Sequence, residues 1–172
     1  YQDEIKIPKD RIAVLLGTKG KVKREIERKT GTKLKVDSRE GDVFISSEDS
    51  LAIFTTKPII QAIGRGFNPS IALKILEEEN SFELIDITDF SRKSKSRLQV
   101  LRSRIIGTKG KARRLLELLT HTDIEVYGKT IGIIGLQEDV AISKQALTNL
   151  LHGSKHGNVY AYIDRQTRNK TY

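Results

Sequence analysis

The segment Gly17-Thr18-Lys19-Gly20-Lys21 occurs a second time in the chain, ninety residues later, as Gly107-Thr108-Lys109-Gly110-Lys111. The match continues at the same offset, and ten of the twenty positions from 17 to 36 are identical to their counterparts in the second copy. An internal repeat of this length indicates two copies of one folding unit. The chain of 172 residues is long enough for two small domains, so the repeat predicts a tandem arrangement.

Each copy places the glycine segment between two helix-forming stretches. An apolar pair precedes it, Leu15-Leu16 in the first copy and Ile105-Ile106 in the second, and a basic stretch follows. Alternating apolar residues further out predict strands. The expected order is strand, helix, glycine loop, helix, strand, strand, helix. In the first copy we expect these elements at residues 4–8, 11–16, 21–29, 33–36, 42–45 and 48–63, and in the second at 82–87, 97–106, 111–119, 124–127, 130–134 and 137–151.

Two segments outside the copies have their own patterns. Asn68-Pro69 is typical of a helix start, with Asn68 as the capping residue, and predicts a connecting helix that reaches Leu76. The run from Val159 to Ile163 alternates in the manner of a strand and would add to a sheet edge.

A Gly-x-x-Gly turn before a basic helix suits contact with phosphates. Neither glycine carries a Cβ, so the main chain can approach a sugar-phosphate backbone closely. The following helix points its N–H groups and positive dipole end at the phosphates. The apolar pair would form a groove floor for unstacked bases, and the edge strand, which includes Glu125-Val126, would face their Watson–Crick edges. This is the binding mode of KH domains, whose loop holds about four nucleotides of a single strand.

The predicted fold is therefore α+β, with two tandem type I KH domains (βααββα each), a short connecting helix and a C-terminal extension. The expected ranges are 1–66 for the first KH domain, 67–80 for the connecting helix, 81–152 for the second KH domain and 153–172 for a tail with the added strand. A Walker A loop fits less well, because it needs a glycine five residues before the Gly-Lys pair. Leu15, Ile105 and Asp123 occupy those positions.

The charge distribution favours the second copy as the main binding site. Net charge is +9 and the pI is about 9.7, which favours a polyanionic partner such as nucleic acid or an anionic membrane. Residues 1–80 hold 15 basic and 13 acidic side chains, whereas residues 81–172 hold 16 and 9. Ten basic residues and no acid lie between Phe90 and Leu116. The expected RNA-binding residues are Arg104, Ile105, Ile106, Gly107, Thr108, Lys109, Gly110, Lys111, Arg113, Arg114, Glu125 and Val126, with a secondary site at Gly17, Thr18, Lys19, Gly20 and Lys21.

The sequence offers little for catalysis. It has no cysteine, and His121, His152 and His156 are not arranged as metal ligands, so we expect no metal, no cofactor and no enzymatic activity. It has no signal peptide and no apolar stretch of membrane-spanning length, so we expect a cytoplasmic protein. The chain starts at Tyr1 and contains no methionine, so we expect a trimmed N-terminus.

With both copies placed, the chain resembles the archaeal members of the Dim-two family of small-ribosomal-subunit biogenesis KH proteins, called "partner of Nob" in eukaryotes. The resemblance covers nearly the whole chain and rests on residues 104–111, 126–130, 150–153 and 157–160 and on the junction at 62–69. The glycine loop is common to all KH proteins, whereas the junction and tail motifs are narrower. The eukaryotic members have degenerate first KH units, whereas the first unit of this chain keeps both glycines of the loop. The first unit can therefore be expected either to bind RNA or to contact a protein.

The resemblance implies a non-catalytic RNA-binding factor for 16S rRNA 3′-end maturation and ribosome assembly. The partners it implies are the 3′ end of 16S rRNA, the PIN-domain rRNA endonuclease and the alpha subunit of translation initiation factor two. Two alternatives stay open. One is a tandem-KH regulator that binds mRNA or single-stranded DNA, and the other is a protein scaffold in which Phe67, Tyr160 and Tyr162 face partners.

Overall fold

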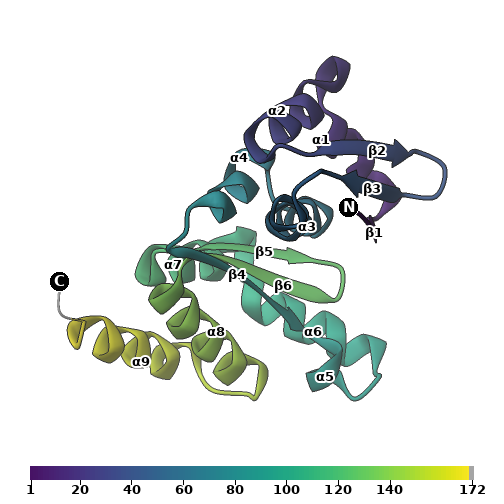
Figure 1. The fold of residues 1–172 in the computed structure, drawn as a ribbon. Coiled ribbons are helices and arrows are strands. Elements are labelled where there is room, and N and C mark those ends of the chain that lie inside the picture. The colour runs from purple at the N-terminus through teal and green to yellow at the C-terminus, as the bar shows by residue number, and fades with distance from the viewer. Residues whose placement is uncertain (171–172) are drawn as a thin grey trace. The chain divides into compact units, whose positions relative to one another are not determined.

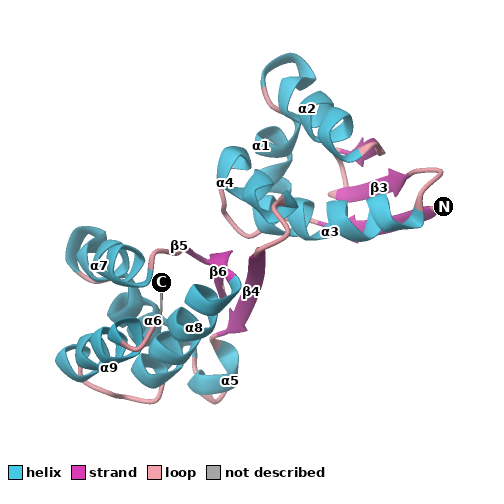
Figure 2. Cartoon of the chain, turned by 60° about the vertical axis from the view of Figure 1, so that its left-hand side comes forward, coloured by secondary structure: helices cyan, strands magenta, loops and turns pink. Residues whose placement is uncertain are grey.

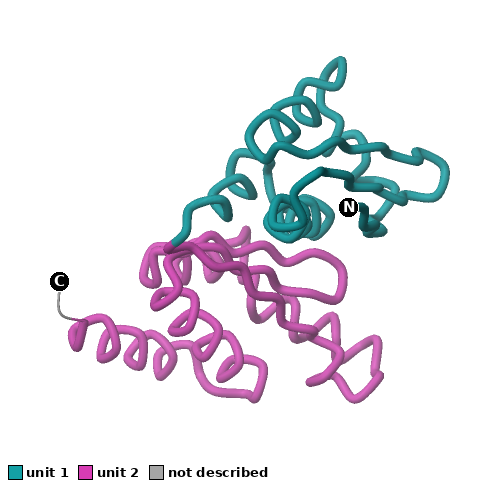
Figure 3. Tube along the Cα trace, in the orientation of Figure 1, with its two compact units in different colours: residues 1–78 teal, residues 79–172 magenta. Residues whose placement is uncertain are grey.

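The computed structural model describes residues 1–170, and the chain forms two compact units, residues 1–78 and 79–172 (Figure 3). Both units follow the expected order of strands and helices (Figure 1). No helix within residues 1–170 has the length and apolar character needed to cross a bilayer.

The elements of unit 1 are β1 (Gln2–Lys6), η1 (Lys9–Arg11), α1 (Ile12–Leu16), η2 (Thr18–Gly20), α2 (Lys21–Thr30), β2 (Lys33–Asp37), β3 (Asp42–Ser46), α3 (Ser50–Gly64), α4 (Pro69–Ala72) and η3 (Leu73–Leu76). Those of unit 2 are β4 (Asn80–Asp86), α5 (Thr88–Ser91), α6 (Lys95–Ile106), η4 (Thr108–Gly110), α7 (Lys111–Thr120), β5 (Asp123–Tyr127), β6 (Thr130–Leu136), α8 (Gln137–Leu151) and α9 (His156–Arg168).

Unit 1 contains a three-stranded antiparallel sheet with the order β1-β3-β2. In the register, Val43 on the middle strand lies between Ile5 and Val36. Successive residues of a strand point to opposite faces. Val43 and Ile45 are fully buried on the face that α3 covers, and Phe44 between them is half-buried and belongs to the other face. The helices therefore cover one face of this sheet.

Unit 2 has the same sheet, in the order β4-β6-β5, with α6, α7 and α8 along one face (Figure 2). Side chains from the sheet and the helices form a single core. Its buried members are Ile85, Ile87, Leu101, Ile105, Leu116, Ile124, Ile131, Ile133, Val140, Ala146, Leu147, Leu150, Leu151, Val159 and Ile163. The α+β fold with two KH-type units is thus confirmed.

Several of the repeated residues join the second helix of each unit to the strand that follows it. The carboxylate of Glu117 accepts a hydrogen bond from the N–H of Ile124 at 3.0 Å, and Glu27 accepts one from the N–H of Leu34 at 2.8 Å. The identical threonine pairs Thr30–Thr32 and Thr120–Thr122 are hydrogen-bonded within each pair, at 2.8 and 2.7 Å between hydroxyl oxygens. These identities fix the position of the helix on the strand, so they belong to the fold and not to a binding surface.

The segment after Gly153 is a helix, so the prediction of an added strand at residues 159–163 is wrong. Helix α9 packs against α7 and α8. Val159 and Ile163 are four residues apart, which places them on one face of a helix, and both are buried in the core of unit 2. Tyr160 and Tyr162 pack partly buried against the same core. The segment expected as a separate tail therefore contributes to the packing of unit 2.

The connection between the units is less helical than the expected helix over residues 67–80. Asn68 caps α4 as predicted, its side chain accepting a hydrogen bond from the N–H two residues on at 3.0 Å. The chain then tightens into the 3₁₀ turn η3, leaves helical geometry at Glu77 and enters β4 at Asn80. Three consecutive acids, residues 77–79, follow this turn. Like charges repel each other, and the C-terminal end of a helix disfavours anions, so this run ends the helical segment.

Candidate nucleic-acid interface

The Gly-x-x-Gly loop of unit 2 stands between α6 and α7 and is held in one unusual conformation. Gly107 ends α6 with φ 73° and ψ 176°, and Lys109 and Gly110 are left-handed, with φ 53° and 75°. A Cβ on Gly107 would lie 2.7 Å from the Cβ of Ala112 and 2.8 Å from its backbone nitrogen. No side chain fits there, because Gly107 packs directly against the first turn of α7.

The loop of unit 1 has the same conformation. Gly17 has φ 72° and ψ 176°, Lys19 has φ 53°, and Gly20 has φ 73°. A Cβ on Gly17 would lie 2.4 Å from Cγ2 of Val22. The first loop therefore keeps the geometry of the second in full, and its backbone shows no degeneration.

The exposed residues of the second loop are donors and cations. Thr108, Lys109 and Lys111 are exposed. The N–H groups of Thr108 and Lys109 open the 3₁₀ turn η4, where N–H groups have no acceptor within the helix. The ten-residue helix α7 begins directly after the turn and adds the positive end of its dipole. Backbone donors, two lysines and a helix N-terminus thus converge where an anion would lie.

One arginine in each unit lies over the second glycine of the loop. The Nη1 atom of Arg114 lies 3.0 Å from the position that a Cβ on Gly110 would take, and Arg24 has the same relation to Gly20. Arg24 also donates a hydrogen bond from Nη1 to the carbonyl of Lys19 at 2.7 Å. This repeated arginine is exposed in both units, so it adds a cation beside the loop.

The apolar pair beside the loop is divided between core and surface. Ile105 is fully buried, so the prediction that both isoleucines form the groove floor is wrong for this residue. Ile106 is half-exposed and is the apolar residue that can touch a ligand. The nearby edge strand is β5, on which Glu125 and Val126 are half-buried and Val126 packs against the core.

Two of the expected RNA-binding arginines are occupied within the fold. The Nη2 atom of Arg104 donates to the carbonyl of Ser154 at 2.6 Å, and the carbonyl of Arg104 lies 2.9 Å from Nε2 of His156. Arg104 therefore ties the end of α6 to the start of α9. A second fold contact comes from Arg113, whose Nη1 donates to Glu117 at 2.8 Å and to the carbonyl of residue 124 at 3.2 Å. Both arginines are half-buried, so the basic run is in part structural.

The acidic residues of α2 are turned to neighbouring lysines. Glu27 pairs with Lys23 at 3.5 Å besides holding the following strand, and Glu25 pairs with Lys29 at 3.3 Å. These pairings reduce the repulsion that the two carboxylates would exert on an anion at the first loop. Helix α7 has a single acid, Glu117, which accepts hydrogen bonds from Arg113 and from the N–H of Ile124 on β5.

The three histidines are placed as structural residues. His121 takes the left-handed position (φ 57°) that ends α7, where unit 1 has Gly31. The ring of His152 packs edge-on against Phe90, with 4.9 Å between centroids. Within residues 1–170 no three residues of the types His, Cys, Asp and Glu are grouped so as to hold a metal ion. Phe67 is fully buried, which corrects the expectation that its ring would face a partner.

Comparison with known proteins agrees with this geometry. Residues 81–168 match the model of the second KH domain of PNO1 proteins, a eukaryotic-type (type I) KH domain, and residues 2–64 match the general KH-domain model. A KH domain-containing protein of Methanocaldococcus jannaschii is 44% identical over 166 residues, which are 94% of this chain and 72% of that protein. The pre-rRNA-processing protein pno1 of Schizosaccharomyces pombe is 27% identical over 119 residues, 69% of this chain and 49% of that protein.

A solved structure resembles the chain over almost its full length. In the crystal structure of the a/eIF2alpha–aDim2p–rRNA complex from Pyrococcus horikoshii, a chain is 42% identical, with a TM-score of 0.90. The match covers 99% of this chain and 96% of that one. The resemblance therefore includes both units and the helix α9.

Proposed function

The chain belongs to the PNO1/Dim2 family of tandem KH-domain proteins, and we propose that it binds single-stranded rRNA at the 3′ end of 16S rRNA as a non-catalytic factor in small-subunit maturation. The observation that carries this proposal is the second glycine loop. It offers bare main chain, two exposed lysines and Arg114 beside a half-exposed isoleucine. Relatives in this family are named for pre-rRNA processing, and one is crystallised with rRNA.

The loop suits a single strand better than a duplex. Phosphates would lie against the N–H groups of Thr108 and Lys109, and a base would rest on Ile106. A duplex keeps its bases stacked and paired, so they would not reach an apolar surface beside the loop. The edge of β5 lies on the sheet of the same unit and supplies main-chain groups for base edges.

We assign the main site to unit 2 because of the charges around its loop. Helix α7 has one acid and α2 has two within two turns of the loop, and all three are paired, so the difference is one additional negative charge beside the first loop. The residues we propose for contact are Gly107, Thr108, Lys109, Gly110, Lys111, Ile106 and Arg114, with the edge strand at Glu125 and Val126. The first loop, with the same backbone, is a secondary site.

We also propose two protein partners. The first is the alpha subunit of translation initiation factor two, because the similar aDim2p chain is crystallised with that factor and rRNA together. The second is the PIN-domain endonuclease that the family resemblance implies. On this proposal the chain positions the rRNA end and a separate nuclease cuts it, so the purified protein should leave a precursor rRNA fragment intact with Mg²⁺ or Mn²⁺.

The test compares two matched pairs of lysines. Lys109→Ala with Lys111→Ala should weaken binding of a single-stranded fragment from the 3′ end of 16S rRNA by about thirty-fold, taking about 1 kcal/mol for each exposed ion pair. The plot of log K against log salt should flatten by about 1.4, because about 0.7 is lost for each phosphate contact. The matched control is Lys19→Ala with Lys21→Ala, in a loop of the same geometry.

The control pair should cost less affinity than the test pair. Equal losses from both pairs would contradict the assignment to unit 2 while leaving RNA binding intact. An affinity that does not respond to salt, or one that is equal for the duplex of the same sequence, would contradict the phosphate-clamp mechanism altogether.

A further inference from the structure

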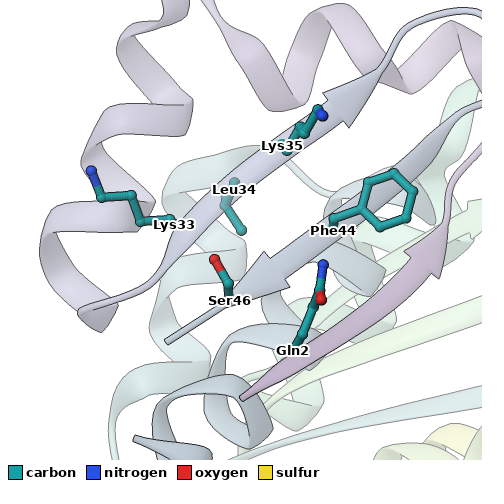
Figure 4. A pocket seen from close by; sticks show the side chains of 6 residues that line it. All are labelled: Gln2, Lys33, Leu34, Lys35, Phe44 and Ser46. Carbon is teal, nitrogen blue, oxygen red and sulfur yellow. The ribbon is translucent and has the colours of Figure 1, made fainter. Parts of the chain in front are cut away.

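The open face of the unit 1 sheet carries an aromatic and basic surface that the glycine loop does not use. Phe44 lies on the middle strand, between Glu4 on β1 and Lys35 on β2. Figure 4 shows these strands with the side chains around a shallow hollow of ≈ 440 Å³. The side chains that line it are Gln2, Lys33, Leu34, Lys35, Phe44 and Ser46.

The chemistry of this surface matches single-stranded nucleic acid. Bases stack on aromatic side chains, and open antiparallel sheets that carry aromatics are a known way to bind RNA. Lys33 and Lys35 are exposed, and neither has an ion-pair partner among residues 1–170. Residues two apart on a strand are about 6.8 Å apart. This spacing is comparable to that of successive phosphates in an extended strand.

Unit 2 lacks the same surface. In the repeat, Asp123 and Glu125 replace the two lysines, and Gly132 lies opposite Glu125 where Phe44 lies opposite Lys35. The apolar residue between the two charges is kept, as Leu34 and Ile124, and both are buried. The framework of the strand is therefore conserved while its outward charges are reversed, so the lysines are not required by the fold.

We propose that this face of unit 1 is a further contact for single-stranded RNA, with one base stacked on Phe44 and phosphates along Lys33 and Lys35. The proposal rests on the RNA-binding function proposed above but uses a different surface. Glu4 flanks the ring on the β1 side and disfavours phosphate there, so the strand would reach Phe44 from the β2 edge. Strand β2 follows and contacts α2, the helix that begins at the first loop, so this edge is on the side of the sheet to which that helix packs.

The experiment uses two lengths of RNA from the 3′ end of 16S rRNA. A fragment of about twelve nucleotides is long enough to extend beyond one loop, whereas one of about four fills a single loop. Phe44→Leu, which keeps an apolar side chain but removes the ring, should weaken binding of the longer fragment by about tenfold. Binding of the shorter fragment should not change. The double variant Lys33→Asp with Lys35→Glu introduces the residues that unit 2 has at these positions. It should also make the affinity for the longer fragment depend less on salt.

The matched control is Phe54→Leu, since Phe54 is 75% exposed on α3 of the same unit and lies outside the hollow. It should leave both affinities unchanged, and circular dichroism should show all variants folded. If Phe44→Leu binds the longer fragment as tightly as the original chain does, the inference is overturned. A loss of RNA affinity in the Lys109 and Lys111 variant would in that case still uphold the proposed function. Loss of a protein partner with no change in RNA affinity would assign the face to protein docking and would equally overturn it.

Discussion

The glycine at the start of each loop should be hard to replace because of both its backbone conformation and a packed contact, and Gly31 of unit 1 is the glycine to compare it with. Gly17 and Gly31 both have φ 72°, but ψ is 176° at Gly17 and 26° at Gly31. A Cβ on Gly17 would lie 2.4 Å from Cγ2 of Val22 and 2.8 Å from its backbone nitrogen, whereas a Cβ on Gly31 would have nothing within 4 Å. Gly31 is thus an ordinary left-handed residue, whereas Gly17 combines a conformation that is almost confined to glycine with a contact that leaves no room for a Cβ.

The magnitudes follow from these distances. An alanine in the left-handed region, as in Gly31→Ala, costs about 1–2 kcal/mol, and an alanine in the conformation of Gly17 costs about 1–3 kcal/mol. Overpacking against neighbours that cannot move adds about 1–3 kcal/mol, and only Gly17→Ala bears it, because a backbone nitrogen cannot rotate away. We therefore expect a loss of about 3 kcal/mol for Gly17→Ala and about 1 kcal/mol for Gly31→Ala.

Urea unfolding followed by amide resonances of unit 1 would measure both losses, since the two units need not unfold together. The reasoning is refuted if Gly31→Ala costs as much as Gly17→Ala, because neither the conformation of Gly17 nor its contact with Val22 would then add to the loss of stability. Unit 2 repeats the test, with Gly107 in close contact with Ala112 and Gly153, at φ 105°, with nothing within 4 Å.

Two further predictions concern the C-terminal helix. Arg104→Ala should lower the stability of unit 2 by about 2 kcal/mol, because it removes a charged hydrogen bond to Ser154, and it should change RNA affinity less than twofold. Urea unfolding and RNA titration together check this, and a large loss of affinity at unchanged stability would return Arg104 to the RNA site. Burial raises the pKa of Tyr160 above its ordinary value of 10.0. The folded state therefore keeps the phenol neutral while the unfolded chain ionises, so stability falls as pH rises through 10.0, and Tyr160→Phe should lose less stability over that range.

The repeat made much of the fold predictable. Helix α8 has the bounds that the sequence predicted, residues 137–151, and both glycine loops stand between helices as expected. Helix α8 has a helical spacing of apolar residues that continues over several turns. Each glycine loop has a second copy in the chain, and both copies must fit the same secondary structure. Burial of Ile105 was not readable from the apolar pair, because the direction of each side chain depends on how α6 lies on the sheet.

The C-terminal helix shows where a short pattern misleads. Five residues, Val159–Ile163, fit a strand by alternation and a helix by the i, i+4 spacing of their ends. A comparison of the two copies held the missing signal. At residue 119, α7 has leucine where α2 has Lys29, and this leucine packs against the core that α9 completes, whereas Leu115, in place of Glu25, stays exposed. An apolar residue at a position that is charged in the first copy indicates that a further element covers that part of the second.

The arginines show a limit of a different kind. Arg113 and Arg114 are adjacent in sequence but about 100° apart around a helix, and only the first reaches the strand. A count of basic residues assigns both to RNA, while the structure assigns one to the fold. The repeat again gives the distinction, because position 114 is arginine in both copies and lies over the loop in both, whereas position 113 corresponds to Lys23.

The two copies therefore differ in what surrounds a shared loop. Backbone angles of the loops agree within a few degrees, and the carboxylate and threonine contacts behind them are the same. The differences lie in the outward residues of one strand, in the exposed face of one helix and in the helix added to unit 2. If the loop alone determined the ligand, both units would bind the same RNA equally. On the function proposed above, the opposite charges on β2 and β5 predict that each unit binds a different part of the RNA, which the lysine-pair and Phe44 variants would distinguish.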